Sequence, residues 1–267
     1  MARIDGGIGN QFFQYAFARS LSIDANVKLV LDIRHLLSRG HRDFVLNQIG
    51  APYDRLISNE EDLRFGDVIA STFFSVKETS VNFCSNAAKI NKTKYLKGFW
   101  QTDKYFNRHS AQLIKDLTDN DIYQNVSHFL VDGEETASIH IRRGDYLENE
   151  KYFPVGSKYF NKAAAIASSV AGINRFLVFS DDVDWVKKNI DIKNASFADD
   201  LGLTALEEIY LMSLCRVNII ANSTFSWWGA YLNMSKNKKV ICPNRWYGPN
   251  FEEAKDIYPD SWRPIDC

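Results

Sequence analysis

Apolar residues along this chain fall into short continuous runs of strand length, separated by longer segments in which they recur at helical spacing. The clearest strand-like runs cover residues 137–141, 175–180 and 217–221. Two earlier runs cover residues 27–33 and 95–100. Buried strands that alternate with helical segments predict an α/β fold with mostly parallel sheets.

The helical segments are recognised by apolar residues three and four positions apart. One such pattern begins at Gln11 and ends at Leu21, directly after a glycine-rich turn. Further helices are expected over residues 111–130, 158–171, 183–190 and 204–215. No internal repeat or long flexible linker is evident, so the chain is expected to fold into compact domains.

A polar segment, VDGEET at residues 131–136, lies between two halves of similar length. We therefore expect an N-terminal domain over residues 1–133 and a C-terminal domain over residues 134–267. Each half is of ordinary domain size.

The three clearest strands each run into side chains that can bind a ligand. These side chains are Arg142, Arg143 and Asp145 after the first strand, Asp181 and Asp182 after the second, and Asn222, Ser223 and Thr224 after the third. In open α/β sheets, ligands bind outside the carboxyl ends of the strands. The pattern therefore predicts one polar site at this edge.

Two readings of the Arg-Arg pair remain open at this point. Arginine offers a planar fork of donors that suits two phosphate oxygens, which indicates an anion site. A surface turn with solvated charges would leave the same pattern. Strand alternation puts His140 on the same face as Arg142, away from the isoleucines.

The neighbouring motifs also have structural alternatives. Asp181 and Asp182 could accept hydrogen bonds from a nucleoside or hold a metal ion with a diphosphate, while Asp182 is also well placed to cap a helix. The hydroxyls of Ser223, Thr224 and Ser226 could hold a phosphate or cap the next helix. The adjacent tryptophan pair is more typical of a core.

The turn GGIGNQ at residues 6–11 is typical of a loop that approaches a phosphate, but a tight strand-to-helix turn explains it equally well. A dinucleotide fingerprint would need glycine at Phe12, which disfavours a nicotinamide oxidoreductase. The scattered histidines and cysteines show no metal-ligand spacing.

Composition limits the partners. The 267 residues carry a formal net charge of −1, so no broad attraction to nucleic acid or anionic lipid is expected and any anion site must be local. No segment is typical of a signal peptide or a membrane span. We expect a cytoplasmic protein with at most peripheral association at the inner face of the membrane.

Several motifs in one order resemble the alpha-1,2-fucosyltransferases of glycosyltransferase family 11. They are GGIGNQFFQYAFARSL, GFWQTDKYF, HIRRGDY, FSDD with Trp185, NSTFSWWGAYL and the tail PNRWY. The resemblance covers nearly the whole chain. It implies a GT-B fold, in which two Rossmann-like halves face each other across a cleft, with an acceptor-side N-terminal half and a GDP-fucose-binding C-terminal half.

The resemblance also implies roles for residues. The enzymes invert the anomeric centre, need no metal or cofactor, and use GDP-fucose and a galactose-terminated glycan, such as an O-antigen precursor. Arg142 would neutralise the departing diphosphate and His140 would line the donor pocket. The expected helpers and substrate contacts are Arg143, Asp181, Asp182, Asn222, Ser223, Thr224 and Ser226 from the C-terminal half, with Gly7, Gly9, Asn10 and Gln11 across the cleft.

The catalytic base is left open among Asp145, Glu148 and Glu150. Related fucosyltransferases carry a glutamate a few residues after the arginine pair, which favours Glu150, while Asp145 could instead orient an arginine. Fucosyl transfer in another linkage, or to another acceptor, is the nearest alternative function. A non-catalytic nucleotide-sugar or glycan-binding protein is the other.

Overall fold

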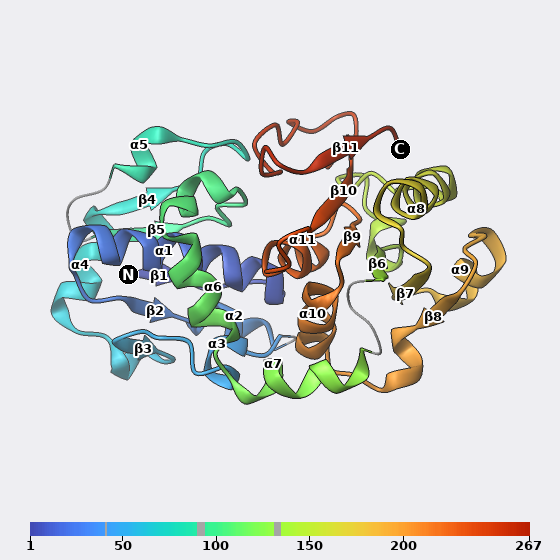
Figure 1. The fold of residues 1–267 in the computed structure, drawn as a ribbon. Coiled ribbons are helices and arrows are strands. Elements are labelled where there is room, and N and C mark those ends of the chain that lie inside the picture. The colour runs from blue at the N-terminus through green and yellow to red at the C-terminus, as the bar shows by residue number, and fades with distance from the viewer. Residues whose placement is uncertain (41, 90–93, 131–134) are drawn as a thin grey trace. The chain divides into compact units, whose positions relative to one another are not determined.

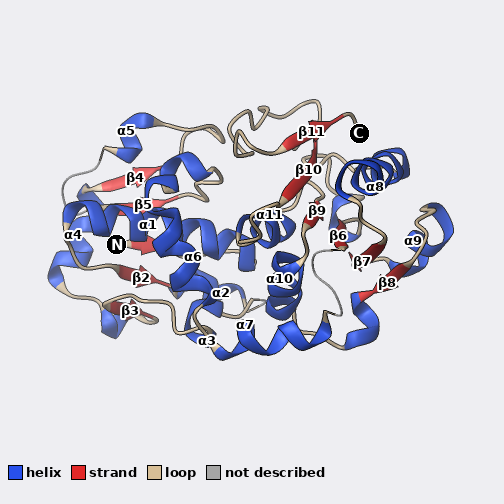
Figure 2. Ribbon diagram, in the orientation of Figure 1, coloured by secondary structure: helices blue, strands red, loops and turns tan. Residues whose placement is uncertain are grey.

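The structure is a computed structural model that describes residues 1–40, 42–89, 94–130 and 135–267. The chain forms two compact units, each with its own sheet and helices (Figures 1 and 2). Unit 1 comprises Met1–Asn120 and Lys255–Pro259, and unit 2 comprises Asp121–Ala254 and Asp260–Cys267.

This division differs from the expected boundary between residues 133 and 134. The polar segment in which that boundary was expected lies largely outside the described residues. The units separate at Asn120 because α7 (Asp121–Val126) packs against α10 (Ala205–Leu214) of unit 2. The Tyr123 ring meets the Tyr210 ring edge-on at 5.2 Å.

Unit 1 is built on a five-stranded parallel sheet in the order β3-β2-β1-β5-β4. Its strands are β1 (Ala2–Arg3), β2 (Val30–Asp32), β3 (Arg55–Ile57), β4 (Ser75–Lys77) and β5 (Tyr95–Lys97). Its helices are α1 (Ile8–Ala25), α2 (Arg34–Arg39), α3 (Val45–Gln48), α4 (Phe65–Phe73), α5 (Ser85–Ala88) and α6 (Ser110–Thr118).

The long helix α1 is the centre of the unit 1 core. Its side chains Phe12, Phe13 and Phe17 are all fully buried. Phe17 packs against Trp100 at a ring separation of 4.9 Å and against Tyr105 at 4.5 Å. The predicted helix over residues 11–21 is therefore correct and extends by several residues at both ends.

Unit 2 is built on a six-stranded parallel sheet in the order β11-β10-β9-β6-β7-β8. Its strands are β6 (Thr136–Ile141), β7 (Arg175–Ser180), β8 (Ala195–Phe197), β9 (Val217–Ile219), β10 (Lys239–Pro243) and β11 (Arg263–Ile265). Besides α7 and α10, its helices are α8 (Ser157–Ala171), α9 (Val183–Asn189) and α11 (Thr224–Tyr231).

The strand order of unit 2 places a topological switch point beside β6. From β6 the chain adds β7 and β8 on one side of the sheet, and then returns to add β9, β10 and β11 on the other. This is the Rossmann order, in which ligands bind at the carboxyl ends of the strands next to the switch point. Every residue of β6 is buried, as a central parallel strand requires.

Helices α10 and α11 pack closely behind the loop that follows β9. A Cβ atom on Gly229 would lie 2.8 Å from Cβ of Met212, so this crossing requires a glycine. Trp227 and Trp228 are fully buried, and Trp227 stacks on Tyr231 at 4.7 Å. The expectation that this tryptophan pair belongs to the core is confirmed.

The predicted α/β fold with parallel sheets is confirmed, but one helix is not continuous. The segment expected to be a single helix over residues 111–130 is interrupted at Asp119 and Asn120, between α6 and α7. Among the described residues, no helix combines the length and the apolar character needed to cross a bilayer.

Candidate functional site

Arg142 is the first residue after β6 and joins the ends of two neighbouring strands. Its Nη1 lies 3.0 Å from Oδ2 of Asp181, which is the first residue after β7. Its Nε and Nη2 donate to Oδ1 of Asp145 at 3.0 and 2.7 Å. These contacts fix the plane of the guanidinium at the switch point of the sheet.

Gly144 permits the close approach of Asp181 to this turn. A Cβ atom at position 144 would lie 2.8 Å from Oδ2 of Asp181, the atom that pairs with Arg142. The residues Gly144–Tyr146 form a short 3₁₀ turn that returns Asp145 towards Arg142. The Gly-Asp pair after the arginines therefore has a direct steric and electrostatic role.

Arg143 is held more firmly than Arg142. Its backbone N donates to Oδ1 of Asp181 at 2.9 Å, and its Nε donates to Oδ2 of Asp182 at 3.2 Å. The guanidinium lies 3.6 Å above the ring of Trp185. Asp182 also accepts from the backbone N of Trp185 at 3.1 Å and so caps α9, as its sequence position suggested.

The charges of this cluster nearly balance. Two arginines face Asp145, Asp181 and Asp182, so a diphosphate would meet a net negative cluster unless a carboxylate moved away. The side chain of Asp145 is 58% exposed, more than either of the other two carboxylates. Asp145 is therefore the counter-ion that an anionic ligand can displace with the least disturbance.

His140 is the second-last residue of β6 and lies two positions before Arg142. Its side chain is buried, and its Nδ1 has no hydrogen-bond partner among the described residues. Burial, together with the charge of Arg142, lowers the pKa of His140 to about 3. The ring lies 5.2 Å from the ring of Phe225 on α11. A neutral imidazole with an unused polar atom therefore faces the N-terminal turn of α11.

The loop after β9 is held by Asn222. This fully buried side chain donates from Nδ2 to the carbonyl oxygens of Phe153 at 2.9 Å and Trp246 at 2.7 Å. Ser226 is also buried and donates to the carbonyl oxygen of Ser223 at 3.3 Å. Asn222 and Ser226 thus support the loop, and their contact with substrate stays a prediction.

Ser223 and Thr224 lie at the start of α11. The Ser223 Oγ accepts from the backbone N of Phe225 at 3.3 Å and so caps α11. Helix capping was one of the two roles predicted for this hydroxyl. Thr224 is only partly buried. Of the predicted hydroxyl residues, Thr224 is the most exposed, whereas Ser223 and Ser226 are buried.

Tyr146 connects the loops that follow β6 and β9, a role that the sequence did not suggest. Its hydroxyl donates to the carbonyl oxygen of Asn222 at 3.2 Å. Its ring stacks on Tyr152 at 4.0 Å with an interplanar angle of 5°. Burial raises the pKa of Tyr146 well above its usual value, so the phenol stays protonated.

The candidate bases have different surroundings. Asp145 is bound to Arg142, whereas Glu148 and Glu150 are exposed and form no ion pair with either arginine among the described residues. The carbonyl oxygen of Glu150 packs against Gly248, where a side chain would collide with it. The backbone at Glu150 is fixed, while its carboxylate extends into solvent.

The glycine turn of unit 1 contains Gly7, Gly9, Asn10 and Gln11, so these predicted residues belong to the unit that does not contain the arginines. Gln11 is fully buried, and its amide donates to the carbonyl oxygens of Gly6 and Asp43. It therefore holds the turn together. Asn10 is partly exposed and accepts from Nε2 of Gln101 at 2.8 Å.

Gly6 has the left-handed φ of +82° that the turn requires, while Gly7 caps α1. Among the described residues, no group of three or more His, Cys, Asp or Glu side chains is arranged to hold a metal ion.

Comparison with known proteins identifies relatives along the whole chain. The family model described as Glycosyl transferase family 11 matches residues 2–266. The O-antigen biosynthesis glycosyltransferase WbnK of Escherichia coli is 31% identical over 97% of this chain and 98% of its own. The Alpha-1,2-colitosyltransferase of Escherichia coli is 30% identical over 100% of this chain and 98% of its own.

A more distant relative matches one part of the chain. Galactoside alpha-(1,2)-fucosyltransferase 1 of Homo sapiens is 32% identical over 35% of this chain and 28% of its own. Among solved structures, NodZ alpha-1,6-fucosyltransferase has a TM-score of 0.51 at 15% identity, over 86% of this chain and 90% of its own. The likeness in structure confirms the predicted GT-B fold.

Proposed function

Because the chain belongs to glycosyl transferase family 11, we propose that it transfers L-fucose from GDP-β-L-fucose to the 2-hydroxyl of a terminal galactose in a glycan. The transfer inverts the anomeric centre and needs no metal ion. The observation that carries this proposal is the guanidinium of Arg142, held by Asp145 and Asp181 at the switch point of the unit 2 sheet.

Departure of GDP requires that the charge developing on the diphosphate be stabilised. Arg142 has five N–H groups, and three of them are engaged by Asp145 and Asp181, so two remain for phosphate oxygens. Ser223, Thr224 and the N-terminus of α11 lie at the end of the neighbouring strand β9. These groups supply the positive potential that a metal ion would otherwise provide.

Displacement of Asp145 by the diphosphate would convert the cluster from net negative to neutral. Asp181 and Asp182 stay in place because each holds a backbone N–H as well as an arginine. Each of their oxygens has a second acceptor position, which is available to the ribose hydroxyls or the guanine N–H groups. Both carboxylates can therefore orient the arginines and contact the nucleoside.

Inversion places the acceptor hydroxyl on the side of the anomeric carbon opposite the diphosphate. Asp145 lies on the side of Arg142 and of the diphosphate that displaces it, so it orients Arg142 before the donor binds. Glu150, exposed and unpaired with either arginine among the described residues, remains the predicted base.

A second donor is favoured by one specific observation. The full-length relative at 30% identity is named an alpha-1,2-colitosyltransferase, so colitose is the alternative sugar in the same linkage. The alternative shares the proposed diphosphate site and differs only in the sugar.

Purified protein should be incubated with lactose and either GDP-fucose or the corresponding colitose donor. The proposal predicts that GDP-fucose gives the higher kcat/KM, and that NMR of the product shows an α-1,2 linkage to galactose. A higher kcat/KM for the colitose donor would mean that colitose, and not fucose, is the sugar transferred. A different linkage would contradict the proposed transfer to the 2-hydroxyl of galactose.

A further inference from the structure

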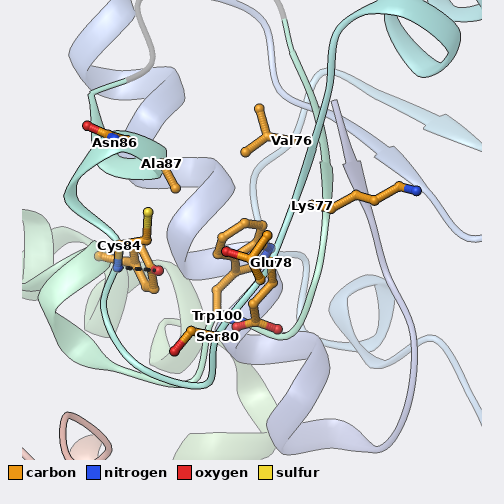
Figure 3. Close-up of a pocket in the computed structure, with 10 residues that line it drawn as sticks. Val76, Lys77, Glu78, Ser80, Cys84, Asn86, Ala87 and Trp100 are labelled. Atoms are coloured by element: carbon orange, nitrogen blue, oxygen red, sulfur yellow. Dashed lines mark hydrogen bonds between the residues drawn. The ribbon is translucent and has the colours of Figure 1, made fainter.

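Unit 1 contains a cavity of about 170 Å³ that the donor chemistry does not use (Figure 3). Its walls include Val76, Glu78, Cys84, Ala87, Trp100 and Tyr105. We propose that this cavity binds one neutral pyranose ring of the acceptor glycan. The inference rests on the proposed function and names the part of unit 1 that recognises the acceptor.

The cavity opens at the ligand-binding edge of its sheet. Glu78 follows β4 directly, and the segment that begins at Gly98 follows β5. A larger cavity of about 230 Å³ lies at the opposite edge, between the end of α1 and the start of β2 and β5. Parallel α/β sheets bind ligands at the carboxyl ends of their strands. The smaller cavity is therefore favoured as the ligand site because of its position, although it is not the larger of the two.

The wall of the cavity is built on strained backbone. Trp100 has a φ of +58°, a left-handed conformation that is rare outside glycine. The Glu78 carboxylate holds this conformation by accepting from the backbone N of Phe99 at 2.8 Å and of Trp100 at 2.7 Å. Gly98 allows the approach, because a Cβ atom there would collide with Glu78.

Strained backbone of this kind clusters at ligand sites. Here it sets the indole of Trp100 edge-on to the ring of Tyr105 at 5.4 Å and 88°. The Tyr105 hydroxyl in turn accepts from the backbone N of Cys84 at 2.9 Å and fixes the opposite wall (Figure 3).

The chemistry of the walls suits a sugar. Val76 and Ala87 can contact the C–H face of a pyranose beside the buried rings of Trp100 and Tyr105, while Ser80 and Asn86 are polar groups that can contact its hydroxyls. The volume is well below the roughly 300–1,000 Å³ of sites for drug-sized ligands, so one ring fits and a nucleotide does not.

Among the described residues, two charged side chains line the cavity, those of Lys77 and Glu78. The Glu78 carboxylate is occupied by two backbone N–H groups. The Lys77 side chain extends away from the other labelled side chains (Figure 3). These features favour a neutral sugar over an acidic one.

The cavity is also connected to the glycine turn of unit 1. Gln101 follows Trp100 in the chain, and its Nε2 donates to Oδ1 of Asn10 in the first turn of α1 at 2.8 Å. One loop therefore carries both the cavity wall and a contact to the residues that the sequence assigned to the acceptor side.

Cys84 provides a direct test in the intact protein. Cys84 and Cys267 are partly exposed, whereas Cys215 and Cys242 are buried, so iodoacetamide should label the first two. Lactose at ten times its Kd should slow alkylation of Cys84 by about tenfold, in proportion to the occupied fraction. Cys267, in unit 2, is the internal control, and mass spectrometry of peptides reads both sites.

Unchanged alkylation of Cys84 at lactose concentrations that saturate transfer would overturn the inference and leave the proposed function intact. Protection of Cys84 without any transfer from GDP-fucose would support the cavity and contradict the proposed function. Failure of the cavity inference and failure of the proposed function can be told apart, because alkylation is measured without GDP-fucose and transfer is measured with it.

A cavity-filling variant tests the same inference by kinetics. Ala87→Leu should raise the KM for lactose by about tenfold or more and leave the KM for GDP-fucose unchanged. Ala25→Leu fills the cavity at the opposite edge of the sheet and should leave both constants unchanged. An unchanged KM for lactose in a folded Ala87→Leu protein would contradict the inference.

Discussion

Arg142 and Arg143 are adjacent in the chain but differ in what surrounds them. Arg143 stacks on Trp185, pairs with Asp182 and is 16% exposed, so it ties the loop after β6 to α9. Arg142 is 31% exposed and pairs with a carboxylate that is itself largely in solvent. Of the two, Arg142 can reach a ligand, and Arg143 positions the loop that carries it.

His140 provides a test of the buried environment beneath these arginines. The native state favours neutral imidazole, with a pKa lowered to about 3, whereas the unfolded chain binds a proton near pH 6.5. Between these values the unfolded state binds more protons, so stability is lost as the pH falls.

We predict that His140 contributes a slope of about 1.4 kcal/mol per pH unit to the unfolding free energy between pH 6 and pH 4. Unfolding free energies from urea denaturation of His140→Asn should change less steeply with pH, by about this amount. The exposed His128 provides the matched control, because His128→Asn leaves His140 in place and should retain the wild-type change of unfolding free energy with pH. Equal slopes in wild type and His140→Asn would contradict the buried neutral imidazole.

At the scale of elements, the sequence predicted the central strands better than the edge strands. The run over residues 175–180 matches β7 because a buried parallel strand is a continuous apolar segment. Strands β3, β4, β8, β10 and β11 were not predicted. The four edge strands among them, β3, β4, β8 and β11, have at most one buried residue each and so carry little apolar pattern.

The candidate site was predicted in part for the same reason. Strand ends are visible in the sequence, so Arg142 and Asp181 were both expected at one edge, and they form an ion pair. The supporting contacts depend on segments far apart in the chain. Asn222 holds the carbonyl oxygen of Phe153, and Tyr146 reaches the loop after β9. Such contacts have no local signature.

Helix α10 carries a capping box that should contribute to stability without affecting catalysis. The hydroxyl of Thr204 accepts from the backbone N of Glu207 at 3.4 Å, and the Glu207 carboxylate accepts from the backbone N of Thr204 at 2.7 Å. Because α10 packs against α11, the cap supports the helix that presents Ser223 and Thr224.

We predict that Thr204→Ala lowers the unfolding free energy by about 0.5–2 kcal/mol, the usual effect of losing such a cap. Its kcat/KM should stay within about twofold, since the cap is an element of stability. Glu207→Gln preserves the capping box and is the control. A denaturation midpoint of Thr204→Ala equal to that of wild type would count against this role.

At the scale of the whole molecule, the net charge of −1 requires that any anion site be local. The structure agrees, because the two arginines lie together at the edge of the unit 2 sheet. Unit 1 has its own parallel sheet, glycine turn and cavity. Under the two proposals, unit 2 binds an anion and unit 1 binds a neutral ring.

The most direct test of the central claim is lactose-dependent release of GDP from GDP-fucose in the presence of EDTA, measured for wild type and Arg142→Ala. Loss of one preorganised donor to a developing charge costs about 2.7–4 kcal/mol, so kcat should fall by about 10²–10³. Arg175→Ala removes an exposed arginine at the other end of β7 and should retain wild-type turnover.

Wild type and Arg175→Ala are expected to release GDP in EDTA only when lactose is present, and Arg142→Ala is expected to do so at about 1% of this rate or less. Near-normal turnover by a folded Arg142→Ala protein, or turnover in wild type that EDTA abolishes, would contradict it.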